Sequence, residues 1–228
     1  MGIRRGSIST PIIADGLVFN MDAANRASTI PSTSTSTAFN TIDTAISGTF
    51  EGGANYDSST VTPSFNFDGA DEYIDMSSTV IDFTTGDFTT AAWINVANDG
   101  NHQGIFGIRI SGQSAASLQF YVRNNNLLYS WNGSTDVTST STISNDVWVN
   151  AVLVQNGSNK EFYINGSLDR AVAQGNGNSS SATLKLGYTG HSAEFLNGNI
   201  GPAHIYNRAL SANEVLHNYN ALKSRFGL

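Results

Sequence analysis

Short segments in which hydrophobic and polar residues alternate recur along the chain. In the stretch DFTTAAWINV, residues 87–96, the side chains of Phe88, Ala92 and Ile94 share one period-two face. A similar alternation over Gly16 to Asp22 predicts a first strand. Asn-Gly pairs, which favour tight hairpins, punctuate the later segments at Asn132, Asn156, Asn165 and Asn197. The pattern therefore predicts about a dozen short antiparallel strands.

The pattern changes to a helical period near the C-terminus. Ser211 lies three residues before Glu214, the spacing of a capping box. The apolar positions that follow, at steps of three and four residues, are Val215, Leu216, Tyr219, Leu222 and Phe226. We therefore predict a helix over about 211–226 that packs on the strands through Leu216, Tyr219 and Leu222.

These elements predict an all-β fold: a two-sheet antiparallel sandwich with one short C-terminal helix. Residues 1–15 are polar, carry the basic pair Arg4 and Arg5, and precede the first strand. We expect them to form an N-terminal arm that is unpacked in the monomer and contacts a partner through Arg4 and Arg5. Residues 16–228, including the helix, then form one domain.

Composition excludes several classes of function. The 228 residues include no cysteine, which removes disulfides, thiolate metal sites and cysteine nucleophiles. The net charge is −7 with no basic patch, so we expect no nucleic-acid partner. No apolar run approaches the roughly 20 residues of a spanning helix, and no secretory signal follows the N-terminal basic pair. We therefore expect no membrane partner.

Three blocks of the sequence resemble a known family. They are SFNFDGADEYIDMSSTVIDFTTGDFTTAAWINV at residues 64–96, VWVNAVLVQNGSNKEFYINGSLDRAV at 147–172, and LKLGYTGHSAEFLNGNIGPAHIYNRALSANEVLHNY at 184–219. Together they resemble the laminin G-like, concanavalin A-like jelly-roll domain. The resemblance implies that the sandwich is a jelly roll and that the final helix lies against it.

Two further segments, GLVFNMDAANRAS at residues 16–28 and NYNALKSRFGL at 218–228, are similar to virion structural proteins of tailed bacteriophages. This resemblance implies a non-enzymatic virion surface protein that decorates or cements the capsid or belongs to a tail appendage. Its partners would be other virion proteins, and it would be assembled in the host cytoplasm, which fits the lack of cysteine. We also expect a homo-oligomer, because attachment through several weak contacts gains from avidity.

The alternative is a carbohydrate-binding, lectin-like module that recognises host or environmental glycans. Trp131 precedes an Asn-Gly turn and lies near Tyr129, so these two rings are the candidates for contact with a sugar. Trp93 and Trp148 lie in strong strand patterns, and we expect both to pack in the core.

Catalytic and metal sites are weakly signalled. Closely spaced carboxylates of the glucanase type are absent, and the four histidines show no recognisable partner spacing, so we expect no enzyme. Asp68 and Asp71 belong to the densest acidic cluster and are candidate calcium ligands, because calcium takes hard oxygen ligands. Alternatively, Asp68 and Gly69 simply form a turn. No other cofactor is expected.

Overall fold

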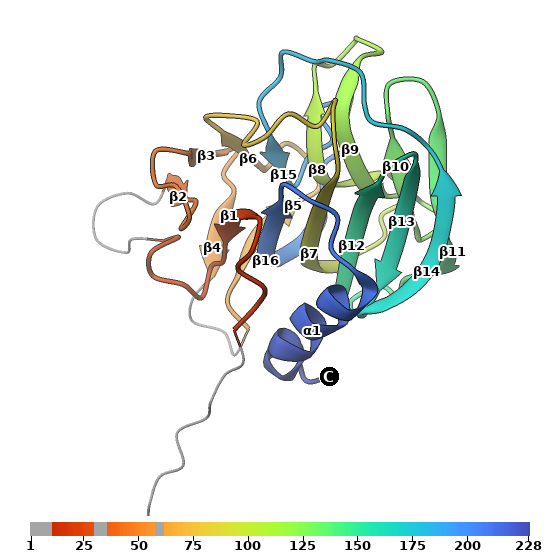
Figure 1. Ribbon diagram of the computed structural model, residues 1–228. Helices are drawn as coiled ribbons and strands as arrows, with labels where there is room; N and C mark the ends of the chain where they lie inside the picture. Colours follow the sequence, from red (N-terminus) through yellow and green to blue (C-terminus); the bar gives the residue numbers. More distant parts are fainter. Residues whose placement is uncertain (1–10, 30–35, 58–61) are drawn as a thin grey trace, which may run out of the picture.

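The computed structural model describes residues 11–29, 36–57 and 62–228. Over these residues the chain forms two antiparallel eight-stranded sheets that lie face to face (Figure 1). The first sheet contains β14 (Ser167–Ala173), β13 (Asn159–Ile164), β12 (Val149–Asn156), β7 (Phe88–Val96), β16 (Asn197–Tyr206), β5 (Ser64–Asp68) and β4 (Asn55–Asp57), with β1 (Leu17–Met21) also paired to β16. The second contains β11 (Asp136–Thr142), β10 (Leu127–Trp131), β9 (Ala116–Val122), β8 (Gln103–Arg109), β15 (Lys185–Leu186), β6 (Tyr73–Met76), β3 (Ser47–Glu51) and β2 (Thr37–Phe39). The predicted all-β sandwich is confirmed.

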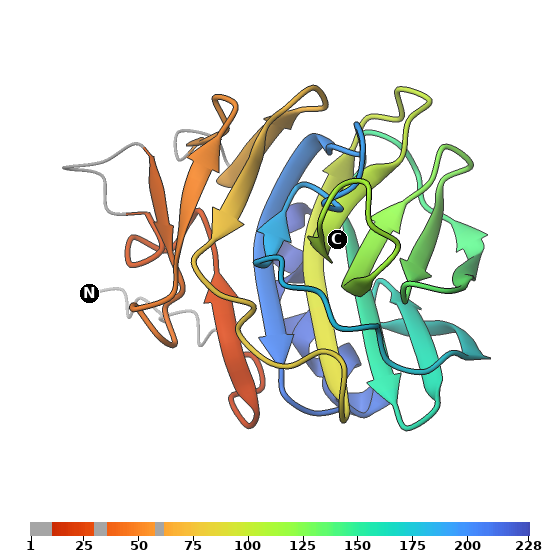
Figure 2. The same ribbon diagram turned by 90° about the horizontal axis from the view of Figure 1, so that it is seen from above.

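Alternation along each strand divides its side chains between the core and an outer face. On β7, Phe88, Ala92 and Ile94 lie in the main hydrophobic core, as predicted. Trp93 and Asn95, on either side of Ile94, point away from the second sheet. Each of the two sheets therefore has an outer face whose side chains lie outside the main core. Figure 2 shows the two layers from above, with the helix outside the first sheet.

The C-terminal helix covers part of the outer face of the first sheet. Helix α1 (Ala212–Leu222) begins at Ser211, whose hydroxyl accepts a hydrogen bond from the Glu214 backbone while the Glu214 carboxylate accepts one from the Ser211 backbone. The predicted capping box is thus confirmed. A 3-10 turn (Lys223–Phe226) follows. Among the described residues no helix is long and apolar enough to span a membrane.

Aromatic stacking fixes the helix on the sheet. The ring of Trp93, fully buried on β7, stacks on Tyr219 with centroids 5.6 Å apart and on Phe226 at 4.1 Å. Gly201 of β16 permits this approach, since a Cβ there would lie 3.1 Å from the Phe226 ring. Trp93 is therefore buried, as expected, but beneath the helix rather than between the sheets.

The prediction for Leu216 is wrong, because its side chain is 42% exposed. The helix is rotated so that Asn218 faces the sheet beside Val215. The carboxamide of Asn218 donates to the Tyr206 hydroxyl and accepts from the Ile13 backbone N–H. A buried polar residue with partners on two neighbouring segments outweighs the apolar periodicity, and Leu216 turns to the surface.

The described part of the predicted arm, residues 11–15, lies against this helix. The Ile13 carbonyl accepts a hydrogen bond from the Tyr206 hydroxyl, and the Pro11 carbonyl lies 2.9 Å from Nε2 of His217. Asp15 forms an ion pair with Arg208 at 3.1 Å. These five residues therefore differ from the expectation of an unpacked arm, whereas Arg4 and Arg5 lie outside the described residues.

Candidate functional site

A pocket of about 250 Å³ opens on the outer face of the second sheet. Its walls come from strands β8, β9, β10 and β11 and from the loop that joins β15 to β16. The lining residues are His102, Arg109, Gln119, Tyr121, Arg123, Trp131, Asp136, His191 and Glu194. We call it the arginine–tryptophan pocket. On β9, Gln119 and Tyr121 face it because Leu118, Phe120 and Val122 face the core.

Two glycines bring the β15–β16 loop onto strand β8. A Cβ on Gly104 would lie 2.4 Å from the Thr189 nitrogen, and one on Gly107 would lie 2.3 Å from the Thr189 carbonyl carbon. Only glycine permits such contact between backbones. The Gln119 carboxamide then donates to the Thr189 carbonyl at 3.1 Å. This close passage carries the later loop residues His191 and Glu194 to the pocket rim.

Glu194 gathers polar groups from distant parts of the sequence. Its carboxylate accepts a hydrogen bond from the Thr189 hydroxyl at 2.6 Å. Nδ1 of His102 lies 3.1 Å from Glu194 Oε1, and Nδ1 of His191 lies 3.5 Å from the same oxygen. Two of the four histidines, which show no recognisable spacing in the sequence, therefore meet at one carboxylate through folding.

The opposite wall combines aromatic rings with an ion pair. Arg123 Nη2 lies 2.6 Å from Asp136, and the Arg123 guanidinium lies 4.2 Å from the centre of the Tyr129 ring. The Tyr121 hydroxyl donates to Asp136 at 2.8 Å. Burial, reinforced by the negative charge of Asp136, raises the pKa of Tyr121, so its phenol stays a hydrogen-bond donor.

Arg109 differs from Arg123 because no carboxylate pairs with it within the described residues. Its Nε donates to the Gln113 carbonyl at 2.7 Å and its Nη1 donates to the Gln119 carboxamide at 3.2 Å. The guanidinium carbon lies 6.0 Å from the Trp131 ring centre. The pocket thus contains one cation that is positioned by neutral groups and forms no ion pair among the described residues.

The two aromatic residues singled out from the sequence come together here. Trp131 lines the pocket, and Tyr129 lies beside Tyr121 with ring centroids 5.7 Å apart, since these tyrosines are register partners on β9 and β10. The sequence reasoning missed Arg109 and Arg123. Arg109 lies at an irregularity of β8 and Arg123 lies directly after β9, and their convergence depends on strand pairing that the sequence does not reveal.

Trp148, expected in the core, is half-buried and lies on the outer face of the first sheet. Its ring contacts Phe226, with centroids 4.8 Å apart. Strand β12 begins at the next residue, Val149, so Trp148 lies directly before the strand rather than within it.

Asp68 and Asp71, the candidate calcium ligands, are both exposed. The Asp68 carboxylate accepts a hydrogen bond from the Ala70 backbone at 2.8 Å, which closes a turn. Burial, together with the charges of Asp68 and Asp71, raises the pKa of the neighbouring Glu72. No group of three or more His, Asp and Glu side chains in the described ranges is placed to hold a metal ion. A calcium site there stays a prediction, which melting in calcium and in chelator tests.

The Laminin_G_3 family model, described as the concanavalin A-like lectin/glucanases superfamily, matches residues 68–216. No curated protein sequence matches the chain.

Several solved structures have a similar fold. Trypanosoma rangeli sialidase in complex with 2,3-difluoro-KDN has 15% identity and a TM-score of 0.67 over 96% of this chain and 37% of the sialidase. Domain 4 of AbnA, a GH43 extracellular arabinanase from Geobacillus stearothermophilus, in complex with arabinotriose, has 14% identity and a TM-score of 0.66 over 89% of this chain and 98% of that domain. The binding domain of botulinum neurotoxin DC in complex with SialylT has 14% identity and a TM-score of 0.66 over 91% of this chain and 52% of that domain. The chain spans about a third of the sialidase, and at these identities the likeness is one of fold.

Proposed function

Because this chain belongs to the concanavalin A-like lectin/glucanases superfamily, we propose that it is a carbohydrate-binding module that holds a glycan in the arginine–tryptophan pocket. Two of the similar structures, the arabinanase domain and the neurotoxin binding domain, are complexes with arabinotriose and with SialylT. They support glycan binding as a use of this fold.

The observation that carries the proposal is the combination of rings and planar polar groups around one opening. A sugar presents an apolar ring face and a rim of hydroxyl groups. Trp131 offers a ring for the apolar face. Gln119 and Arg109 offer carboxamide and guanidinium groups for the hydroxyls, and both are already oriented by protein hydrogen bonds. This preorganisation reduces the entropy lost on binding.

We further propose that the preferred glycan carries a carboxylate. Arg123 is paired with Asp136, and Glu194 is engaged by Thr189 and the two histidines, so Arg109 is the cation left to meet a ligand charge. A guanidinium recognises a planar carboxylate through paired hydrogen bonds. Arg109 would therefore select an acidic sugar over its neutral counterpart.

We propose binding without hydrolysis. Glycoside hydrolysis uses two carboxyl groups that flank the scissile bond, one of them able to give a proton to the leaving group. The two carboxylates in the pocket lining, Asp136 and Glu194, are both engaged with protein donors on opposite walls. Incubation with a panel of glycans and analysis of the products tests this proposal. Release of any shorter product by the purified chain would contradict it.

A glycan array followed by calorimetric titration tests the proposed site. Arg109→Ala should weaken binding of an acidic glycan about tenfold to a hundredfold, since a hydrogen bond to a charged group contributes about 1.5–3 kcal/mol. Trp131→Ala should weaken it similarly. The matched control is Arg170→Ala, an arginine on β14 that donates to the Thr138 carbonyl and lies outside the pocket lining. Equal binding by all three variants and the parent would overturn the proposal.

The virion role, its capsid or tail location and the homo-oligomer stay predictions from the sequence. The similar structures reported above are parts of a toxin and of enzymes that act on glycans, and they favour the glycan-binding alternative. Recovery of the chain in purified virions would support the first reading without affecting the second.

A further inference from the structure

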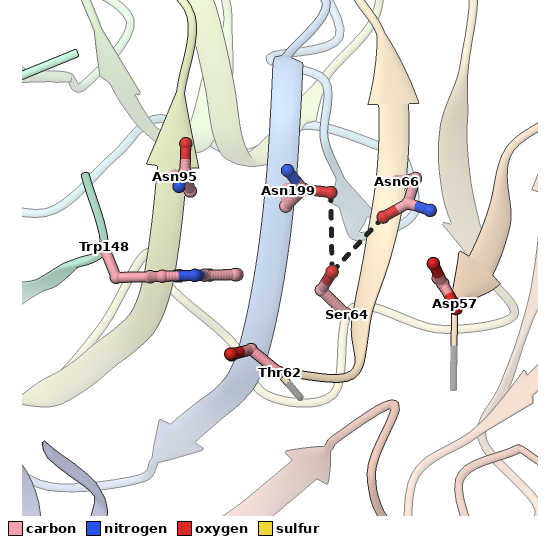
Figure 3. A pocket seen from close by; sticks show the side chains of 7 residues that line it. All are labelled: Asp57, Thr62, Ser64, Asn66, Asn95, Trp148 and Asn199. Carbon is pink, nitrogen blue, oxygen red and sulfur yellow. Dashed lines mark hydrogen bonds between the residues drawn. The ribbon is translucent and has the colours of Figure 1, made fainter. Parts of the chain in front are cut away.

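A second depression, of about 390 Å³, lies on the outer face of the first sheet. Figure 3 shows its lining, and six of the seven side chains are polar: Asp57, Thr62, Ser64, Asn66, Asn95, Trp148 and Asn199. They come from β4, β5, β7 and β16 and from the segments before β5 and β12. No residue of this set lines the arginine–tryptophan pocket, so the two openings are separate.

Four asparagines form a row across four neighbouring strands. Asn95 on β7 is the register partner of Asn199 on β16, Asn199 is the partner of Asn66 on β5, and Asn66 is the partner of Asn55 on β4. We call this row the asparagine ladder. Adjacent strands lie about 4.8 Å apart, so the ladder presents carboxamides at regular intervals along a line across the sheet.

Hydrogen bonds orient part of the ladder and leave part of it free. The Ser64 hydroxyl lies 3.2 Å from Asn66 Oδ1 and 3.4 Å from Asn199 Oδ1 (Figure 3). Asn66 Nδ2 donates to Asn55 at 3.3 Å. Over the described residues, the Asn95 carboxamide and Asn199 Nδ2 have no hydrogen-bond partner. Two carboxamides at the centre of the depression therefore keep donors for a ligand.

Trp148 forms the wall at one end of the ladder. Its half-buried ring is supported from behind by Phe226 and extends toward Asn95 and Asn199 in Figure 3. An aromatic ring beside a row of free carboxamides matches a saccharide, whose ring face stacks on the indole while its hydroxyls bond to the amides.

The charge of the depression selects against anions. Among the described residues its lining contains no lysine or arginine, and Asp57 is the one ionisable side chain. A sulfated, phosphorylated or carboxylated ligand would therefore meet no cationic side chain of the described lining. A neutral ligand loses nothing by this arrangement.

From these observations we infer that the asparagine ladder and Trp148 form a second binding site, which takes a neutral oligosaccharide lying across the strands. One sugar ring stacks on Trp148 and the following residues bond to the carboxamides of Asn95, Asn199 and Asn66. The site goes beyond the proposed function because it is on the other sheet and takes a different class of saccharide. With both sites occupied, one molecule would link two glycans.

Calorimetric titration with neutral oligosaccharides, from disaccharides to hexasaccharides of glucose, xylose, mannose and arabinose, tests the inference. We expect at least one series to bind, with affinity rising with chain length as more of the ladder is contacted. Asn95→Ala should weaken that binding about fivefold or more, because it removes a hydrogen bond of about 1 kcal/mol. Trp148→Ala should weaken it further.

Three controls keep the test specific. Trp148→Ala removes the contact with Phe226 and so could unfold the protein. The Asn95 side chain has no hydrogen-bond partner among the described residues, and its variant should melt like the parent. Asn220→Ala, an exposed asparagine on α1, should bind normally. Trp131→Ala should also bind neutral chains normally. The inference is overturned if no neutral series binds, or if binding is lost in Trp131→Ala and kept in Asn95→Ala. A failure of every neutral series to bind would leave the acidic glycan at the first pocket unaffected, whereas loss of neutral binding in Trp131→Ala would place the neutral chain in that pocket.

Discussion

The outer faces of the two sheets carry pockets of opposite character. The arginine–tryptophan pocket on the second sheet is lined with two arginines, two carboxylates and two histidines, whereas the depression on the first sheet is lined with carboxamides, hydroxyls and one carboxylate. Both arise in the same way, because residues between core positions must point outward. The difference lies in the neighbours: a crossing loop adds charge to one face, and the C-terminal helix adds aromatic support to the other. A single sandwich can thus present two unrelated recognition surfaces.

The largest expected effect is that of replacing Phe226, whose ring packs against Trp148 at the depression on the first sheet. Its ring is almost fully buried between Trp93 and Trp148, so Phe226→Ala should lower the free energy of unfolding by about 3–5 kcal/mol. Urea melts measure the loss. Among molecules that remain folded, binding of neutral chains should fall while binding at the arginine–tryptophan pocket persists. Leu216→Ala, an exposed position on the preceding helix α1, is the control and should change stability by less than about 0.5 kcal/mol. Equal melts for the two variants would mean that the helix does not anchor this face.

The next largest effect is the dependence of affinity on salt concentration, which should differ between the two sites. An attraction between Arg109 and an anionic glycan is screened as ionic strength rises, so affinity at the arginine–tryptophan pocket should drop between low and high salt. Arg109→Gln should lower the affinity at low salt about tenfold and flatten the salt dependence. Titrations with neutral chains should show the same affinity throughout. A steep salt dependence for the neutral chains would remove the distinction between the two sites.

Acid should destabilise the helix on the outer face of the first sheet, because it protonates Glu214 at the N-terminus of that helix. The Arg208 guanidinium, with the Ser211 cap, lowers the pKa of Glu214 to about 2 against an ordinary value of 4.5. A folded-state pKa below the unfolded one means that Glu214 stabilises the fold above about pH 4.5 and that this contribution is lost as the pH falls toward 2. Glu214→Gln should cost about 1 kcal/mol at neutral pH, since the side chain is partly exposed and screened. Melts of parent and variant should converge in acid, and a constant gap would contradict this account.

The smallest effect concerns the hydroxyl that bridges the ladder. Ser64→Ala frees the Asn66 and Asn199 carboxamides from their common partner. Because those groups would have to be ordered again on binding, neutral chains should bind about twofold to fivefold more weakly, corresponding to roughly 0.5–1 kcal/mol. Titration measures the change. Ser134→Ala, at an exposed turn elsewhere, should leave the affinity unaltered.

Local patterns were enough to predict about a dozen strands, the capping box and the inward face of β7, because each depends on residues adjacent in sequence. The described residues contain sixteen strands, so the shorter and more polar ones were missed. The errors have a different origin. Leu216 follows the apolar period, but Asn218 takes the buried position through partners on β16 and near residue 13, which no local pattern contains. Trp148 belongs to an apolar run, yet it lies just outside its strand.

The sites show the same division. Trp131 stood out because it precedes an Asn-Gly turn and lies near Tyr129. Trp131 lines the pocket, Tyr129 lies beside the lining residue Tyr121, and their role in binding stays a prediction. Glu194 and His102 are 92 residues apart and meet only because Gly104 and Gly107 let a loop cross β8. The asparagine ladder likewise depends on the register of four strands. The composition shows that the chain contains asparagines, but only the pairing of the strands shows that four of them lie in one row.

The position of β16 also governs when the fold can form during synthesis. This late strand lies between β7 and β5 and also pairs with β1, so the first sheet stays divided until residues 197–206 have been made. Contacts between residues so distant in sequence form slowly. Before that moment β7 has an open edge and Trp93 is uncovered, and such surfaces promote association between incomplete chains. A ribosome-bound chain that stops before residue 197 should therefore remain a target for chaperones, whatever the stability of the finished sandwich.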